Sequence, residues 1–306
     1  MPHMADRRTI FKLRSNNPLL PMTTNEAIQI FRTRLSGIFD RHEIQAVTRI
    51  VFDYIMHYSP VDMIIHGSDE LPDFMPQKLS GIVNRLAAHE PLQYILGEAR
   101  FHGHKFRVTP ATLIPRPETD MLVDIIVDDN ASATDLRVLD IGTGSGCIAI
   151  SLALVLKFPH VTATDISPAA LAVAQENAAA LKAQVNFCCA DILQAVQNPP
   201  VEAFDIIVSN PPYICQSEIS GMEAHVTDHE PHTALFVPDD DPLRFYKAIA
   251  RYATQALAHG GKLYFEINSR FGDATAALLR SSGFADVNIG NDQYGLPRFA
   301  TATKSA

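Results

Sequence analysis

Short β-rich runs alternate with amphipathic stretches from residue 136 to residue 267, and this alternation strongly limits the available folds. The runs are LRVLDI, HVTATDI, VNFCCAD, FDIIVSN and KLYFEI. Strands that alternate with helical segments form a parallel sheet covered by helices on both faces. Two further runs, ADVNIG and RFATATK, predict a closing hairpin. The sequence therefore predicts an α/β fold for this part of the chain.

The preceding part of the chain has helical periodicity. Thr23 and Glu26 form a capping-box pattern, and Asp40 is placed to cap a second helix. Apolar residues follow each start at helical spacing, which predicts a small bundle packed by its own apolar stripes. We assign this N-terminal helical domain to residues 22–90.

A different pattern connects the two parts. The segment GEARFHGHKFRVTP alternates apolar and polar residues around Gly103, which predicts a β-hairpin in a linker over residues 91–113. Pro117 then opens a predicted helix. The α/β domain is expected over residues 114–304.

Composition and charge exclude several classes of protein. The chain has 306 residues, 47% of them hydrophobic and 19% charged, and a formal net charge of -9. That charge gives no general attraction to a phosphate backbone, and no apolar run approaches the roughly 18 residues of a membrane helix. The four cysteines form no CxxC pattern. We expect a cytoplasmic monomer that binds neither membranes nor nucleic acid stably.

A glycine-rich turn is predicted where the first strand of the sheet ends. The sequence VLDIGTGSGCIAI places Asp140, Gly142, Gly144 and Gly146 between a strand and a helix. Glycines there allow the backbone to approach a ligand, and the helix start offers free N–H groups. The spacing is GxGxG, and Cys147 stands where a dinucleotide-binding GxGxxG motif has its third glycine. A turn without a ligand is the simpler alternative.

Acidic residues also end the next two predicted strands. Asp165 follows the second strand and can accept hydrogen bonds from the two hydroxyls of a ribose. Asp191 follows the third and can accept from an exocyclic amine such as that of adenine, with Ile192 against the ring face. An acid at a strand end is also a common cap or turn residue. With Asp140, however, they form a row at the edge where open α/β sheets bind ligands.

The fourth strand ends in Asn210-Pro211-Pro212-Tyr213. Both prolines lack an N–H and have a fixed φ, so the Asn210 side chain and the Pro211 carbonyl remain available as acceptors. Tyr213 adds a flat ring. This combination suits a planar R–NH2 nitrogen whose two hydrogens are held while its lone pair faces an electrophile. The alternative is a Pro-Pro strand terminator.

These motifs, in this order, resemble class I methyltransferases that use S-adenosylmethionine, and NPPY resembles those that methylate planar amino nitrogens. The resemblance implies a seven-stranded Rossmann-like sheet and S-adenosylmethionine as cofactor, with no metal. It places the cofactor on Gly142, Thr143, Gly144, Ser145, Gly146, Asp165, Asp191, Ile192 and Asn210. It places the substrate on Asn210, Pro211, Pro212 and Tyr213, of which Asn210, Pro211 and Tyr213 are the expected catalytic residues.

Longer segments resemble one family more closely. The stretch EPLQYILGEARFHGHKFRVTPATLIPRPETD, together with HEPHTALF and DPLRFYKAI, is similar to segments of the HemK/PrmC family of release-factor glutamine N5-methyltransferases. The resemblance implies methylation of the GGQ glutamine of class I peptide chain release factors. Glu266-Ile-Asn268 stands where the family more usually has Glu-Ile-Gly, and Asp239–Asp241 replaces a glycine-containing turn. We place both departures outside the core motifs.

Other substrates and a non-enzymatic role are the alternatives to this function. A glutamine of a large-subunit ribosomal protein or the N6 of adenine in nucleic acid presents a similar planar nitrogen to NPPY. A binding module that kept the fold as a scaffold is the non-enzymatic alternative. The histidines of EAHVTDHEPH lie near helical metal spacing, but Pro231 breaks that geometry, and no GxSxG hydrolase motif is present.

Overall fold

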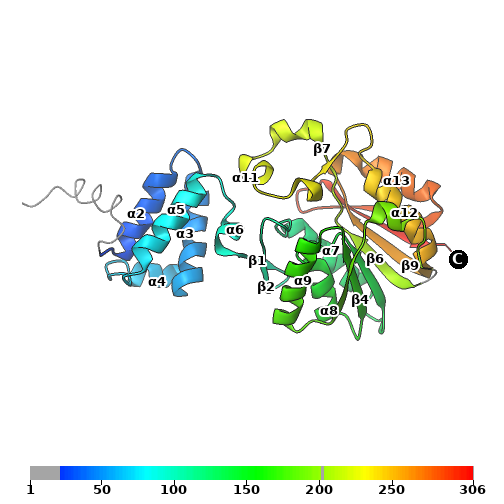
Figure 1. The fold of residues 1–306 in the computed structure, drawn as a ribbon, viewed down its shortest axis with the longest axis horizontal. Coiled ribbons are helices and arrows are strands. Elements are labelled where there is room, and N and C mark those ends of the chain that lie inside the picture. Colours follow the sequence, from blue (N-terminus) through cyan, green and yellow to red (C-terminus); the bar gives the residue numbers. More distant parts are fainter. Residues whose placement is uncertain (1–20, 201–202, 306) are drawn as a thin grey trace, which may run out of the picture. The chain divides into compact units, whose positions relative to one another are not determined.

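The computed structural model describes residues 21–200 and 203–305, and it divides into two compact units between Leu96 and Gly97 (Figure 1). Each unit has a hydrophobic core of its own. Among the described residues, no helix is both long enough and apolar enough to cross a membrane.

The first unit is helical, as its periodicity predicts. Its helices are α2 (Thr24–Leu35), α3 (Arg41–Met56), α4 (Pro60–Ile65), α5 (Met75–Ala87) and α6 (Leu92–Leu96). The predicted capping box is present, because the side chains and backbone amides of Thr23 and Glu26 bond reciprocally. Phe31 and Phe52 are fully buried in the shared core of these helices.

The second unit contains a seven-stranded sheet in the order β10-β11-β9-β6-β3-β4-β5, which confirms the predicted fold class. The strands are β3 (Arg137–Ile141), β4 (His160–Asp165), β5 (Val185–Cys189), β6 (Phe204–Ser209), β9 (Leu257–Glu266), β10 (Phe284–Asn291) and β11 (Pro297–Lys304). Strands β3, β4, β5, β6 and β9 pair in parallel. Strand β11 is antiparallel to both β9 and β10, so the last two strands form the predicted hairpin.

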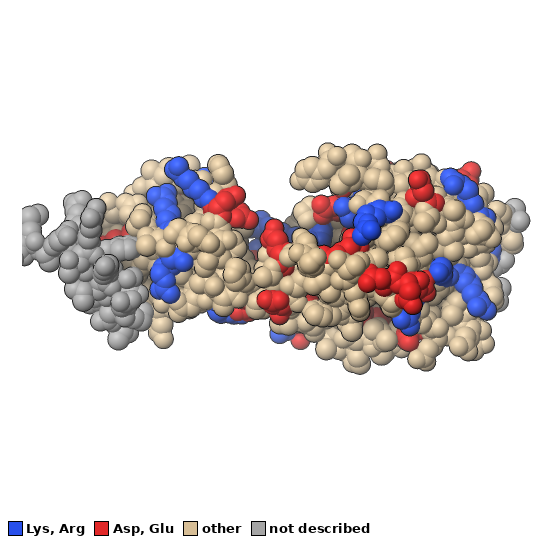
Figure 2. All heavy atoms as spheres, turned by 90° about the horizontal axis from the view of Figure 1, so that it is seen from above, with Lys and Arg blue, Asp and Glu red and all other residues tan. Residues whose placement is uncertain are grey.

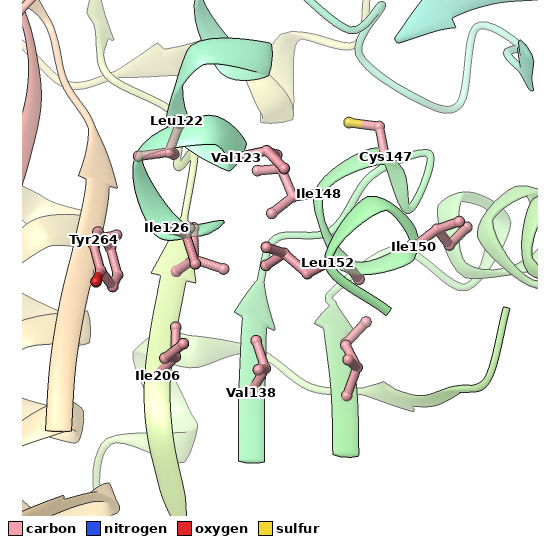
Figure 3. Close-up of a cluster of buried hydrophobic side chains, with 14 of the residues drawn as sticks. Leu122, Val123, Ile126, Val138, Cys147, Ile148, Ile150, Leu152, Ile206 and Tyr264 are labelled. Carbon is pink, nitrogen blue, oxygen red and sulfur yellow. The ribbon is translucent and has the colours of Figure 1, made fainter. Parts of the chain in front are cut away.

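Helices bury both faces of this sheet. They are α7 (Pro117–Asp129), α8 (Cys147–Val155), α9 (Pro168–Leu181), α10 (Ile192–Ala195), α12 (Arg244–Ala256) and α13 (Gly272–Ser281). Successive strand residues point to opposite faces, so Val138 packs with α7 and α8, as Figure 3 shows, whereas Leu139 packs with α12. A strand that is covered by helices on both faces of the sheet needs apolar residues at nearly every position.

Smaller elements complete the second unit. They are the hairpin β1 (Glu98–Phe101) and β2 (His104–Arg107), the parallel pair β7 (Ile214–Cys215) and β8 (Phe236–Val237), the 3-10 helices η1 (Gln216–Gly221), η2 (His232–Ala234) and η3 (Ser269–Phe271), and α11 (Ala224–Thr227). Phe101 and Phe106 of the hairpin pack in the core beside α7 and α8. The subdivision into residues 22–90, 91–113 and 114–304 stays a prediction.

Candidate active site at the carboxyl edge of the sheet

The glycine-rich loop and the NPPY loop leave the sheet side by side. Strands β3 and β6 are parallel neighbours, and Ile141 lies opposite Ser209 at their carboxyl ends. The Ser209 hydroxyl donates to the Ile141 carbonyl at 2.6 Å. The next residues, Gly142 and Asn210, therefore start their loops at the same edge, where open α/β sheets bind ligands.

The glycine-rich loop has a backbone conformation that favours glycine. Gly142 and Gly144 have φ values of 76° and 56°, in the left-handed region, and a Cβ added to either would meet no atom within 4 Å. The space in front of these two glycines is therefore open to a ligand. Gly146 differs, because an added Cβ would lie 2.8 Å from the Ile150 side chain and 3.1 Å from that of Ala174.

Two acids of the predicted row lie at the ends of the neighbouring strands. One oxygen of Asp165 accepts from the Gly144 amide at 2.9 Å and the other from the Ser167 amide at 2.9 Å. Asp191 caps α10 by accepting from the Leu193 amide at 2.9 Å, as an ordinary cap residue would. Both carboxylates retain lone pairs for a ligand, since each oxygen can accept two hydrogen bonds.

Asp140 lies beneath the glycine-rich loop. One of its oxygens accepts from the Thr143 hydroxyl at 2.6 Å and from the Ala149 amide at 3.2 Å. Its other oxygen is buried without a hydrogen-bond partner. Burial opposes the charged form, and it raises the pKa of Asp140 to about 7 against the opposing effect of its two donors. Asp140 thus supports the loop from inside.

The NPPY loop is held by a buried carboxylate. Asn210 donates through Nδ2 to the Thr119 hydroxyl at 3.1 Å, and Thr119 donates to Glu266 at 2.6 Å. The Tyr213 hydroxyl donates to the other Glu266 oxygen at 2.9 Å. Glu266 ends β9, and Thr119 lies in the first turn of α7. Two elements distant in sequence, α7 and β9, therefore converge on Asn210 and Tyr213.

Glu266-Ile-Asn268 lies outside the core motifs in sequence but contacts the NPPY loop in the fold. Glu266 bonds to the NPPY loop, and Asn268 donates to the Tyr213 carbonyl and to Glu218 at 3.1 Å each. Burial raises the pKa of Glu266, and the hydrogen bonds from Thr119 and Tyr213 oppose that shift. A signal was available in the sequence, because Glu266 is one more acid at the carboxyl end of a strand.

A pocket of about 470 Å³ opens beside this cluster. Asn210, Tyr213 and Glu266 line it together with Arg116 and apolar residues that include Leu113, Met222 and Leu235. The wall is fixed by Glu230, whose buried side chain forms an ion pair with Arg116 and accepts from the Ile114 amide at 3.1 Å. The pocket offers one cation, several acceptors and an apolar surface to a substrate.

The histidine-containing segment EAHVTDHEPH contributes to the wall of this pocket. His225 lines it and pairs with Glu223 at 3.0 Å, whereas His232 bonds to the Thr227 carbonyl at 2.7 Å. No group of three or more potential metal ligands occurs within the described parts of the chain. Asp239 of the acidic segment accepts from Ser217, which joins that segment to η1.

Two family models match parts of this chain. The family model described as Methyltransferase small domain matches residues 117–227, and that described as PrmC N-terminal domain matches residues 26–97. A release factor glutamine methyltransferase of Bacteroides thetaiotaomicron is 43% identical, covering 92% of this chain and 100% of the relative. That of Flavobacterium psychrophilum is 41% identical over 89% of this chain and 97% of the relative.

A solved structure described as a release factor-specific protein-(glutamine-N5) methyltransferase from Alicyclobacillus acidocaldarius is 29% identical, with a TM-score of 0.41. It covers 66% of this chain and 100% of that chain.

The fold and the matched domain define a Rossmann-like methyltransferase that uses S-adenosylmethionine. More narrowly, the chain belongs to the release factor glutamine methyltransferase family, as its identity to relatives along nearly their whole length shows. The predicted family and cofactor are confirmed. The roles of the individual site residues stay predictions.

Proposed function

We propose that the protein transfers a methyl group from S-adenosylmethionine to the side-chain amide N5 of the GGQ glutamine in class I peptide chain release factors. One observation carries the proposal for this chain: the open glycine loop starts beside Asn210, whose side-chain amide is held by Thr119 and which lines a pocket. The names of the most similar relatives support the substrate.

The cofactor fits the residues of the glycine-rich edge. Its methionine part would lie along Gly142 to Gly146, with Thr143 and Ser145 between the glycines, because a Cβ added at Gly142 or Gly144 would meet no atom within 4 Å. Asp165 would hold the ribose hydroxyls, and Asp191 and Ile192 would contact the adenine. When bound, S-adenosylmethionine supplies a methyl group on a positively charged sulfur, which makes that carbon electrophilic.

The substrate amide is a weak nucleophile, so the protein must act mainly by orientation. The Asn210 side chain and the Pro211 carbonyl would accept the two hydrogens of the glutamine NH2 group. Pro212 keeps the loop rigid, and Tyr213 would pack on the amide plane. The nitrogen loses one proton when its new bond to carbon forms, and that proton passes to water, because the two carbonyl acceptors orient the hydrogens but are too weakly basic to keep one.

The remaining parts of the chain would serve recognition. Residues 22–90 would position the release factor, residues 91–113 would link the domains, and residues 114–304 would carry out the reaction. Because release factors act in protein synthesis, we place the enzyme in the cytoplasm.

Charge distribution weighs against a nucleic-acid substrate. The chain has a formal net charge of -9. On the face that Figure 2 shows, acidic and basic side chains of the described residues are interspersed, with no continuous basic surface on that view. A flipped adenine would require phosphate contacts around the pocket.

Transfer of a labelled methyl group from S-adenosylmethionine tests the proposal. We expect label in a class I release factor, none in a variant whose GGQ glutamine is replaced by alanine, and none in duplex DNA or the large ribosomal subunit. Labelled DNA would favour the adenine reaction, and labelled ribosomal protein would favour the other glutamine substrate. Either result without label in the release factor would overturn the proposal.

A further inference from the structure

Three hydrogen bonds connect a buried carboxylate to the NPPY loop, which is expected to hold the substrate. Glu266 Oε2 accepts from the Thr119 hydroxyl at 2.6 Å, and the same hydroxyl oxygen accepts from Asn210 Nδ2 at 3.1 Å. The second carboxylate oxygen accepts from Tyr213 at 2.9 Å. The chain of contacts therefore begins at β9, passes through α7 and ends at the NPPY loop.

The chemistry of the carboxylate fixes the direction of these bonds. An ionised carboxylate can only accept, so the single hydrogen of the Thr119 hydroxyl must point to Glu266. The Thr119 oxygen can then only accept from Asn210, which must present its NH2 group to Thr119. The Asn210 carbonyl oxygen is consequently turned away from Thr119, and it remains as the acceptor for the substrate.

Burial makes this direction costly to reverse. Thr119 is 3% exposed and Glu266 is 1% exposed, so water does not replace a lost partner. If the Asn210 amide flipped, its carbonyl would face a hydroxyl oxygen that has no hydrogen left to donate. Leaving these two oxygens facing each other without a hydrogen between them strongly disfavours the flipped amide. The reversed amide would also present a donor, not an acceptor, to the substrate NH2 group.

We propose that Thr119 and Glu266 are positioning residues that fix which end of the Asn210 amide faces the substrate pocket. The inference rests on the proposed function for its catalytic consequence, but the orientation itself is a property of the free enzyme. Substrate selection follows from it: the site accepts an NH2 group and rejects a group that can only accept hydrogen bonds.

Two substitutions of Thr119 distinguish the effect of its hydroxyl from the effect of its shape. Thr119→Val keeps the shape and removes the hydroxyl, whereas Thr119→Ser keeps the hydroxyl. We expect Thr119→Val to lower kcat roughly 10- to 100-fold, Thr119→Ser to remain within about threefold of the wild type, and the affinity for S-adenosylhomocysteine to change little in both. Equal loss in both variants, or no loss in Thr119→Val, would overturn the proposal.

A measurement on the enzyme without substrate tests the orientation of the Asn210 amide independently of the proposed substrate. The Asn210 side-chain NH2 signal in an NMR spectrum can be identified by its loss in Asn210→Ala. We expect slow hydrogen exchange of this signal in the wild type and in Thr119→Ser, and faster exchange with a changed shift in Thr119→Val and Glu266→Gln. If release factors are not methylated but this pattern holds, the proposed function fails and the orientation stands. An unchanged signal in Thr119→Val rejects the orientation whatever the substrate.

Discussion

The backbone amide of Gly144 donates to the carboxylate of Asp165 at 2.9 Å, which links the glycine-rich loop to the end of the neighbouring strand. We therefore expect two roles for Asp165. It shapes the loop in the free protein, and it is the residue expected to hold the ribose of the cofactor. A change at this position affects binding through both.

Replacing Asp165 tests this double role. Asp165→Ala should weaken S-adenosylhomocysteine binding by roughly 100-fold or more, because hydrogen bonds to a charged group each contribute about 1.5–3 kcal/mol. Isothermal titration calorimetry gives the affinity. Asp128→Ala is the control, since Asp128 is exposed in the last turn of α7. Equal affinities for the two variants would exclude Asp165 from the cofactor site.

Gly146 should be required for packing more than for binding. Gly146→Ala places a Cβ against Ile150 and Ala174 at a φ of 81°, so we expect a loss of about 2–3 kcal/mol in the free energy of unfolding. Gly260→Ala has a similar φ of 74° and open space around the Cβ, so it should cost only about 1 kcal/mol. Urea unfolding measures both. A smaller loss for Gly146→Ala than for Gly260→Ala would contradict the packing argument.

Asp140 should make stability depend on pH. Its pKa is raised from 3.8 to about 7, so between these values the folded state holds a proton that the unfolded state has released. The contribution of Asp140 to stability is therefore present at low pH and lost as the pH rises towards 7. We expect Asp140→Asn to flatten the decline in Tm over this range. The same decline in variant and wild type would assign it to other groups.

Protonation of Glu266 should make kcat fall on the acidic side of the pH profile. Burial raises its pKa, with Glu118 of α7 acting in the same direction and Thr119, Tyr213 and Arg298 of β11 acting against it. As the pH falls through this raised pKa, the protonated carboxyl loses its purely accepting character, and kcat should fall. A kcat–pH profile of Glu266→Gln should be lower and lack this fall. If Asp140→Asn removes the fall and Glu266→Gln keeps it, the fall belongs to Asp140.

The sheet and the cofactor edge could be predicted because their signals are local. Apolar runs, glycine spacing and acids at strand ends are each written within a few residues, and parallel strands bring them to one edge. The capping box at Thr23 and Glu26 is local in the same way.

The support for Asn210 could not be predicted in the same way. Thr119 and Glu266 are 91 and 147 positions away from their partners Asn210 and Thr119, respectively. Only the packing of α7 against the end of β9 brings them together. Glu266 carried a signal as a strand-end acid, whereas a lone Thr after Pro117-Glu118 carried none. Arg116 and Glu230, 114 positions apart, were likewise joined only by the fold.

Mass spectrometry of a release factor after incubation with enzyme and S-adenosylmethionine tests the central claim most directly. The wild-type enzyme should add one methyl group to the glutamine of the GGQ loop. Asn210→Ala should lose most of that turnover while it keeps cofactor affinity within about tenfold, because Asn210 acts mainly on the substrate amide. Asn186→Ala, on the exposed surface of β5, should behave as the wild type. An unmodified glutamine with wild-type enzyme, or full methylation by Asn210→Ala, would contradict the account.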